Sequence, residues 1–107
     1  MTITELVHAA HKLSLEKGWY DEGVVNIPEK LALIHSEVSE ALECYRNGEM
    51  TTRFKDGKPE GFPIELADIV IRIADLCGYL GINLDEAVRY KGDYNSNRPY
   101  RHGGKVC

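Results

Sequence analysis

The sequence lacks several features that would place it in other classes of protein. No stretch comes near the roughly 20 consecutive apolar residues that cross a bilayer. The first residues carry no basic start and no apolar block, so we expect no signal peptide and no membrane partner. Cysteine is scarce: Cys44, Cys77 and Cys107 form no Cys-x-x-Cys pair, which predicts reduced thiols in a cytoplasmic protein. The alternation of apolar and polar residues that marks half-buried strands is also missing, so the sequence predicts an all-α fold.

The charge is unevenly distributed along a chain of one domain's length, residues 1–107. The net charge of −4 divides into −8 over the first 88 residues and +4 over residues 89–107. An acidic body repels a nucleic-acid backbone, so we expect no nucleic-acid partner. The same distribution suits carboxylates that hold cations, beside basic groups that hold a small anion.

The spacing of apolar residues and the start and stop signals predict four helices, over residues 4–17, 28–47, 63–81 and 84–94. Thr2 or Thr4 can cap the first helix, and Asn83 can cap the fourth. Residues 49–61, which contain three Gly or Pro, are predicted to form a loop. The architecture expected is a four-helix bundle. The third helix is apolar around roughly two-thirds of its circumference, so we expect a homo-oligomer in which further copies complete the bundle.

Two pairs of carboxylates lie on consecutive predicted helices, Glu37 with Glu40 and Glu65 with Asp68. Residues three apart on a helix are neighbours, so antiparallel packing of the two helices would bring four carboxylates together. Such a cluster needs cations, and oxygen ligands favour Mg²⁺. One pair alone is usually a solvated face, whereas two pairs flanked by apolar residues favour a site. The core face predicted for the second helix comprises Leu31, Ile34, Val38, Leu42 and Tyr45.

These acidic pairs, within residues 31–42 and 65–72, resemble the signature of the MazG-like all-α nucleoside triphosphate pyrophosphohydrolases. Residues 91–105 resemble the C-terminal motif of that family, so the similarity covers roughly residues 28–105. The resemblance implies a Mg²⁺-dependent enzyme that cleaves a nucleoside triphosphate between its α and β phosphates, giving a monophosphate and pyrophosphate. It also implies a dimer or a higher oligomer. The chain has one copy of the motif, unlike the long two-domain members.

The roles expected at the site follow from these residue types. Glu37, Glu40, Glu65 and Asp68 are the expected metal ligands, and either Glu37 or Glu40 can take a proton from the attacking water. The outer phosphates are expected to be held by residues of the basic tail, namely Lys91, Asn95 and Arg98.

Trp19 and Arg72 each have two possible roles. Trp19 can stack on a base or can pack in a core or an interface. Arg72 can pair with Asp68 or with Asp75. His8 and His11 are expected on the exposed face of the first helix.

Two alternative functions can be compared with the enzyme by means of the acidic pairs and the basic tail. An iron protein of the ferritin type uses Glu-x-x-His pairs, and neither acidic pair contains a histidine in that position. A non-catalytic metal-binding helical oligomer or an adaptor stays open, although a basic tail beside the carboxylates favours the enzyme. Glu60, in the predicted loop, lies outside both pairs and is expected to contribute little.

Overall fold

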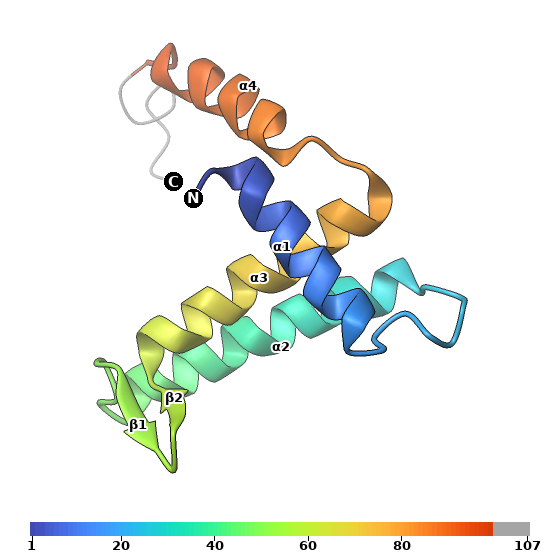
Figure 1. Ribbon diagram of the computed structural model, residues 1–107. Coiled ribbons are helices and arrows are strands. Elements are labelled where there is room, and N and C mark those ends of the chain that lie inside the picture. Colours follow the sequence, from blue (N-terminus) through green and yellow to red (C-terminus); the bar gives the residue numbers. More distant parts are fainter. Residues whose placement is uncertain (100–107) are drawn as a thin grey trace.

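The computed structural model describes residues 1–99, which form four helices and one β-hairpin (Figure 1). The elements in chain order are α1 (Ile3–Glu16), α2 (Ile27–Arg46), β1 (Arg53–Lys55), β2 (Lys58–Glu60), α3 (Phe62–Leu80) and α4 (Leu84–Ser96). All four predicted helices are confirmed, and their bounds agree with the prediction within two residues.

Short polar side chains fix where the helices begin. The Thr2 hydroxyl accepts a hydrogen bond from the Glu5 backbone N–H, and the Glu5 carboxylate accepts one from the Thr2 backbone, which makes a capping box. Asn26 caps α2 and Asn83 caps α4 in the same way, each accepting from the backbone N–H three residues later. The caps predicted at Thr2 and Asn83 are therefore confirmed.

The absence of strands was a wrong prediction, because residues 53–60 form an antiparallel hairpin. Asp56 and Gly57 at its tip both have positive φ, 52° and 81°, as a two-residue type I′ turn requires. Each strand has only three residues, too few to show an alternating pattern. The Asp-Gly pair was the available signal for this hairpin.

Gly61 joins the hairpin to α3 with a φ of 118°, a conformation that side chains disfavour. A Cβ atom at this position would collide with the carbonyl oxygen of Thr51. This close approach folds the hairpin back on the first turn of α3, which contains Glu65.

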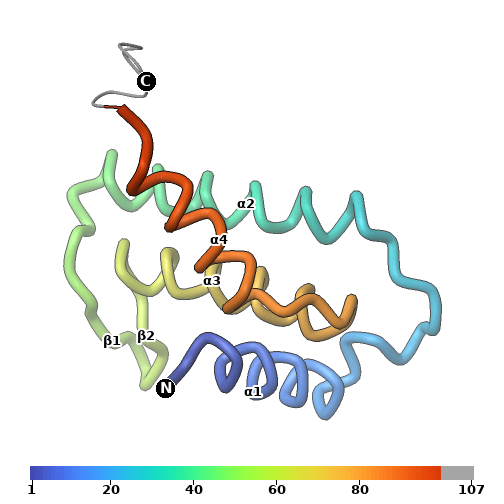
Figure 2. The backbone as a smooth tube through the Cα atoms, turned by 90° about the horizontal axis from the view of Figure 1, so that it is seen from above, coloured from blue at the N-terminus to red at the C-terminus, as the bar shows by residue number. Residues whose placement is uncertain are grey.

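Helix α3 lies between α1 and α2 and packs against both (Figure 2). The small core contains Val7 from α1 with Ala74 and Cys77 from α3. Helix α4 packs mainly against α1, and none of its side chains is buried. The described part of one chain therefore does not close a four-helix bundle. No helix in residues 1–99 has the length and apolar character needed to cross a membrane.

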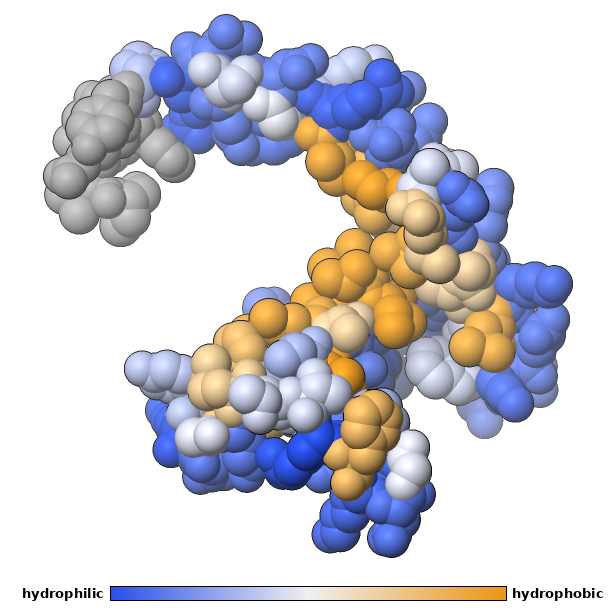
Figure 3. All heavy atoms as spheres, turned by 60° about the vertical axis from the view of Figure 1, so that its left-hand side comes forward, coloured by the Kyte–Doolittle hydropathy of each residue, from blue (hydrophilic) through white to orange (hydrophobic). Residues whose placement is uncertain are grey.

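Residues 1–99 leave most of the predicted core face of α2 uncovered, because α3 packs on another side of the helix, at Glu37 and Ala41. Apolar side chains instead gather in the hollow between α4 and the rest of the protein (Figure 3). The residues of the α2 face that are about half exposed or more are Leu31, Val38, Leu42 and Tyr45.

Candidate functional site

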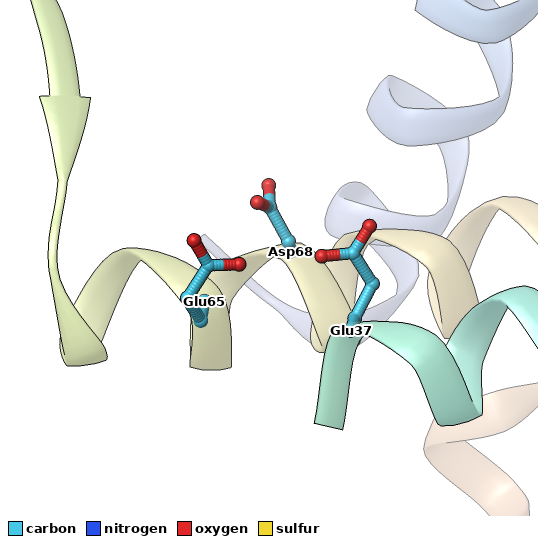
Figure 4. Close-up of side chains that lie close together, drawn as sticks. All are labelled: Glu37, Glu65 and Asp68. Carbon is cyan, nitrogen blue, oxygen red and sulfur yellow. The ribbon is translucent and has the colours of Figure 1, made fainter. Parts of the chain in front are cut away.

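Three carboxylates converge where α2 and the first half of α3 pack together (Figure 4). One oxygen from each of Glu37, Glu65 and Asp68 lies within 4.8 Å of the other two. The antiparallel pairing of α2 with α3 brings together these three of the four carboxylates that were expected to converge. We call this group the acidic cluster.

The acidic cluster is partly buried, and two of its oxygens have no hydrogen-bond partner among the described residues. Glu37 is only 8% exposed, and its Oε2 atom has no hydrogen-bond partner among the described residues. Oε2 of Glu65 is likewise buried and without a donor. A buried polar atom with no partner costs roughly 1–3 kcal/mol, and more where the group is charged, so these oxygens call for a ligand.

Glu40 lies beside the cluster and is exposed. Burial is the largest cause that raises the pKa of Glu65, and with the hydrogen bond and charge of Glu40 and the charges of Asp68 and Glu37 it brings the pKa to about 7. Two carboxylates share a hydrogen bond only when one carries a proton, so the contact with Glu40 adds to the effect of burial. Burial, followed by the charge of Glu37, also raises the pKa of Asp68, while Arg72 and Lys58 act in the opposite direction.

A cavity of about 290 Å³ opens beside the cluster, between α2, the hairpin and α3. The hairpin contributes two cations to its wall, Arg53 and Lys58. Arg53 is paired with Glu49 at 2.7 Å and lies 3.6 Å from Glu60. The cavity therefore has a carboxylate floor and a partly cationic wall.

The donor set fits a hard divalent cation. All donors are carboxylate oxygens, the ligands that Mg²⁺ prefers. Two oxygens on one Mg²⁺ lie at most about 4.2 Å apart, since each bond is about 2.1 Å. The oxygens of the cluster, within 4.8 Å of one another, need only small side-chain adjustments to meet this geometry.

Arg72 pairs with neither of the residues that the sequence suggested. Its Nε donates to Oε1 of Glu37 at 2.9 Å, across from α3 to α2. Sequence spacing pointed to partners on the same helix, and only the packing of α2 against α3 reveals the actual one. The Cζ atom of the guanidinium lies over the Trp19 ring, 5.7 Å from its centroid.

Trp19 is 53% exposed in the loop between α1 and α2, so it is not a core residue of the described chain. A cavity of about 240 Å³ is lined by this loop, with Trp19 and Tyr20 among its residues. Through Arg72, the tryptophan is one contact removed from the acidic cluster.

The predicted phosphate-binding residues of the tail are not beside the cluster within one chain. Lys91 and Asn95 lie on α4, and Arg98 follows it. The side chains of Lys91 and Arg98 both lie over the Tyr94 ring, at 4.9 and 5.4 Å. The rest of the tail motif, from residue 100 on, lies outside the described residues.

A second buried carboxylate, Asp75, lies between α1 and α3 and has three partners. Its Oδ1 is 2.9 Å from Nδ1 of His11, and its Oδ2 accepts from Ser14 at 3.0 Å and from Tyr20 at 2.9 Å. His11 is therefore part of this network and not a residue of the exposed face. Burial and the hydrogen bond to Asp75 raise the pKa of Tyr20.

The hairpin residues of the site were missed from the sequence. Glu60 was expected to stand apart, yet it lines the cavity of the acidic cluster, because the hairpin folds back beside α3. Lys58 and Arg53 were not considered as site residues. The Asp-Gly turn at residues 56 and 57 predicts the hairpin, but not that it covers the cluster.

Comparison of the chain with known protein families, with curated proteins and with solved structures finds no match.

Proposed function

We propose that the protein is a Mg²⁺-dependent nucleoside triphosphate pyrophosphohydrolase, which cleaves between the α and β phosphates. The observation that carries the proposal is the acidic cluster with its two buried, unpartnered oxygens, Oε2 of Glu37 and Oε2 of Glu65. The resemblance of residues 31–42 and 65–72 to the MazG-like family supports the same chemistry.

Glu37, Glu65 and Asp68 would hold the cation, and Glu40 lies where it can join them. Bound Mg²⁺ supplies neutralisation of the phosphate charge and activation of water. Burial of the carboxylates excludes bulk water from the floor of the site, which strengthens their attraction for a cation.

Glu40 is the better-placed group to accept a proton from the attacking water. Glu37 is buried and paired with Arg72, whereas Glu40 is exposed and pairs with no cation among the described residues. A group that moves protons must reach solvent or substrate, which Glu40 can do.

We assign the phosphate chain and the base of the substrate to two different places on the protein. The cavity of about 290 Å³ is at the small end of ligand pockets and suits a phosphate chain, with Lys58 on its wall facing the outer phosphates. The base is assigned to the exposed face of Trp19, because aromatic rings stack on bases with little preference for sequence.

We further propose a homo-oligomer in which a second copy covers the exposed apolar faces of α2 and α3. The chain exposes 8139 Å², against roughly 6,000 Å² for a compact monomer of this mass. In that assembly, α4 of one copy would bring Lys91, Asn95 and Arg98 to the acidic cluster of another.

The direct test is hydrolysis of a panel of ribo- and deoxynucleoside triphosphates with Mg²⁺, with the products resolved. Asp68→Asn keeps the size of the side chain and removes charge, so activity should fall by a factor of at least 100 while the fold persists. Glu43→Gln is the matched control, since Glu43 is an exposed residue of α2 paired with Arg46, and it should change activity less than twofold.

The products decide the reaction class. Monophosphate and pyrophosphate are expected, and orthophosphate alone would leave only a metal-dependent phosphatase. Equal activity in the wild type and Asp68→Asn would refute the site. Tight Mg²⁺ binding with no hydrolysis of any nucleotide would favour the non-catalytic metal-binding oligomer.

Assembly is tested separately by sedimentation and by mixing variants. Sedimentation at micromolar concentration should show an oligomer, and a monomer alone would refute the assembly. If the tail acts on a neighbouring copy, Asp68→Asn co-refolded with Lys91→Gln should recover activity that neither has alone, because some mixed sites are intact. No recovery would place Lys91 with the acidic cluster of its own chain or outside the site.

A further inference from the structure

Arg72 lies between Glu37 of the acidic cluster and the Trp19 ring, and it contacts both. Its side chain is 28% exposed, and its Nε donates at 2.9 Å to Oε1 of Glu37, whose side chain is 10% exposed. This bond engages one oxygen of Glu37 and fixes the orientation of its carboxylate. The other oxygen, Oε2, is the buried atom without a partner.

The same guanidinium lies over the ring of Trp19, with Cζ 5.7 Å from the ring centroid. The backbone around this ring is fixed: the Trp19 N–H donates to the Ser14 carbonyl at 3.1 Å, and Tyr20 is bound to Asp75. Tyr20 also stacks on Tyr79, with centroids 5.0 Å apart and the rings nearly parallel. Because the backbone beside the Trp19 ring is held in place, a movement of Arg72 would change the environment of the ring.

We propose that Arg72 is a positioning residue that couples the occupancy of the acidic cluster to the base-binding face of Trp19. This inference rests on the proposed function, in which the cluster holds Mg²⁺ and Trp19 meets the base. Arg72 orients Glu37 so that Oε2 faces the metal. A cation that takes Oε2 draws on the same negative charge that holds the guanidinium, so the position of Arg72 beneath Trp19 responds to metal binding.

Arginine suits this task and lysine does not. Only a guanidinium can donate along its edge to a carboxylate while its planar face lies on an aromatic ring. A lysine at position 72 would keep the charge but lose the fixed fork and the stacked face. The two effects can therefore be separated by substitution.

The experiment measures Mg²⁺ affinity by calorimetry and the emission of Trp19 during the same titration. Trp19 is the only tryptophan of the chain, so no other indole contributes. Mg²⁺ is diamagnetic and does not quench by itself. In the wild type, the emission should change with the same midpoint as the calorimetric curve.

In Arg72→Gln, Mg²⁺ should bind about 10–100-fold more weakly, as is typical when a residue that orients a metal ligand is lost. Its emission should no longer respond at saturating Mg²⁺. Arg72→Lys keeps a cation beside the buried Glu37, so it guards against misfolding. It should bind Mg²⁺ with intermediate affinity and also lose the emission response.

The matched control is Arg46→Gln, which removes an exposed arginine paired with Glu43 at 3.0 Å. It should behave as the wild type in both measurements. Wild-type affinity in Arg72→Gln, or a full emission response at saturation in Arg72→Gln or Arg72→Lys, would overturn the coupling and leave the proposed function standing. Absence of Mg²⁺ binding in the wild type would overturn both.

Discussion

Asp75 and Glu37 are buried to a similar degree, at 4% and 8% exposure, but their surroundings differ. Asp75, between α1 and α3, has hydrogen-bond partners on both oxygens: a histidine on one, and a serine and a tyrosine hydroxyl on the other. Glu37, between α2 and α3, has one charged partner on one oxygen and none on the other. It also has two further carboxylates within reach.

The difference separates a carboxylate whose oxygens are both bonded from one that keeps an oxygen without a donor among the described residues. A buried charge whose acceptor sites are filled stabilises the elements that supply the donors, here α1, its following loop and α3. A buried charge with an unfilled acceptor and like-charged neighbours destabilises the empty protein and stabilises a complex. The predictions below test this contrast.

The largest effect on stability is expected from Asp75→Ala. Removal of the acceptor leaves Ser14 and Tyr20 with buried donors, so the free energy of unfolding should fall by about 3 kcal/mol. For a domain of this size, the melting temperature should then fall by more than about 10 °C. Asp93→Ala, at an exposed position of α4, is the control and should shift it little. A melting temperature unchanged by Asp75→Ala would show that the network is dispensable.

A smaller and opposite effect is expected when Mg²⁺ is added to the wild type. A ligand that binds only the folded state stabilises it by about 1.4 kcal/mol at ten times its dissociation constant, which should raise the melting temperature by several degrees. Glu65→Gln should lose most of this gain, whereas Asp75→Ala should keep it from a lower starting point. A melting curve indifferent to Mg²⁺ would argue that the carboxylates of the cluster do not act together.

A third effect is a dependence of stability on pH without metal. The pKa of Glu65 is about 7 in the folded protein and near 4.5 in the unfolded chain, so the folded state binds more protons between these values. Stability in the presence of a chelator should therefore fall as the pH rises from about 4.5 to 7. Urea unfolding at pH 5 and pH 7 measures the change. Glu65→Gln should flatten it and Glu43→Gln should not, and a rise in stability over this range would contradict the shift.

The helices and the acidic cluster were largely predictable because local signals specify them. The caps at Thr2 and Asn83, the prolines in the first turns and the three-residue spacing of carboxylates all act within one helix. Consecutive helices commonly pack side by side, and this arrangement suffices to bring Glu37 to Glu65 and Asp68.

The remaining features depend on contacts between elements, which spacing does not reveal. Arg72 reaches Glu37 across a helix interface, and Asp75 gathers partners from residues 11, 14 and 20. The face of α2 that is richest in apolar residues was expected to pack in the chain's own core. Helix α3 lies on the side of Glu37 and Ala41 instead, and no periodicity distinguishes a partner within the chain from a second copy.

The two ends of the hairpin differ in the space around their backbone. A Cβ atom at Gly57, in the tip, would meet nothing within 4 Å, whereas one at Gly61, at the base, would strike the Thr51 backbone. Insertions are accepted best at exposed turns of this kind. A short peptide tag placed between Asp56 and Gly57 should therefore leave the first turn of α3 in place. This position offers a way to immobilise or label the protein within reach of its acidic cluster, without interrupting a helix.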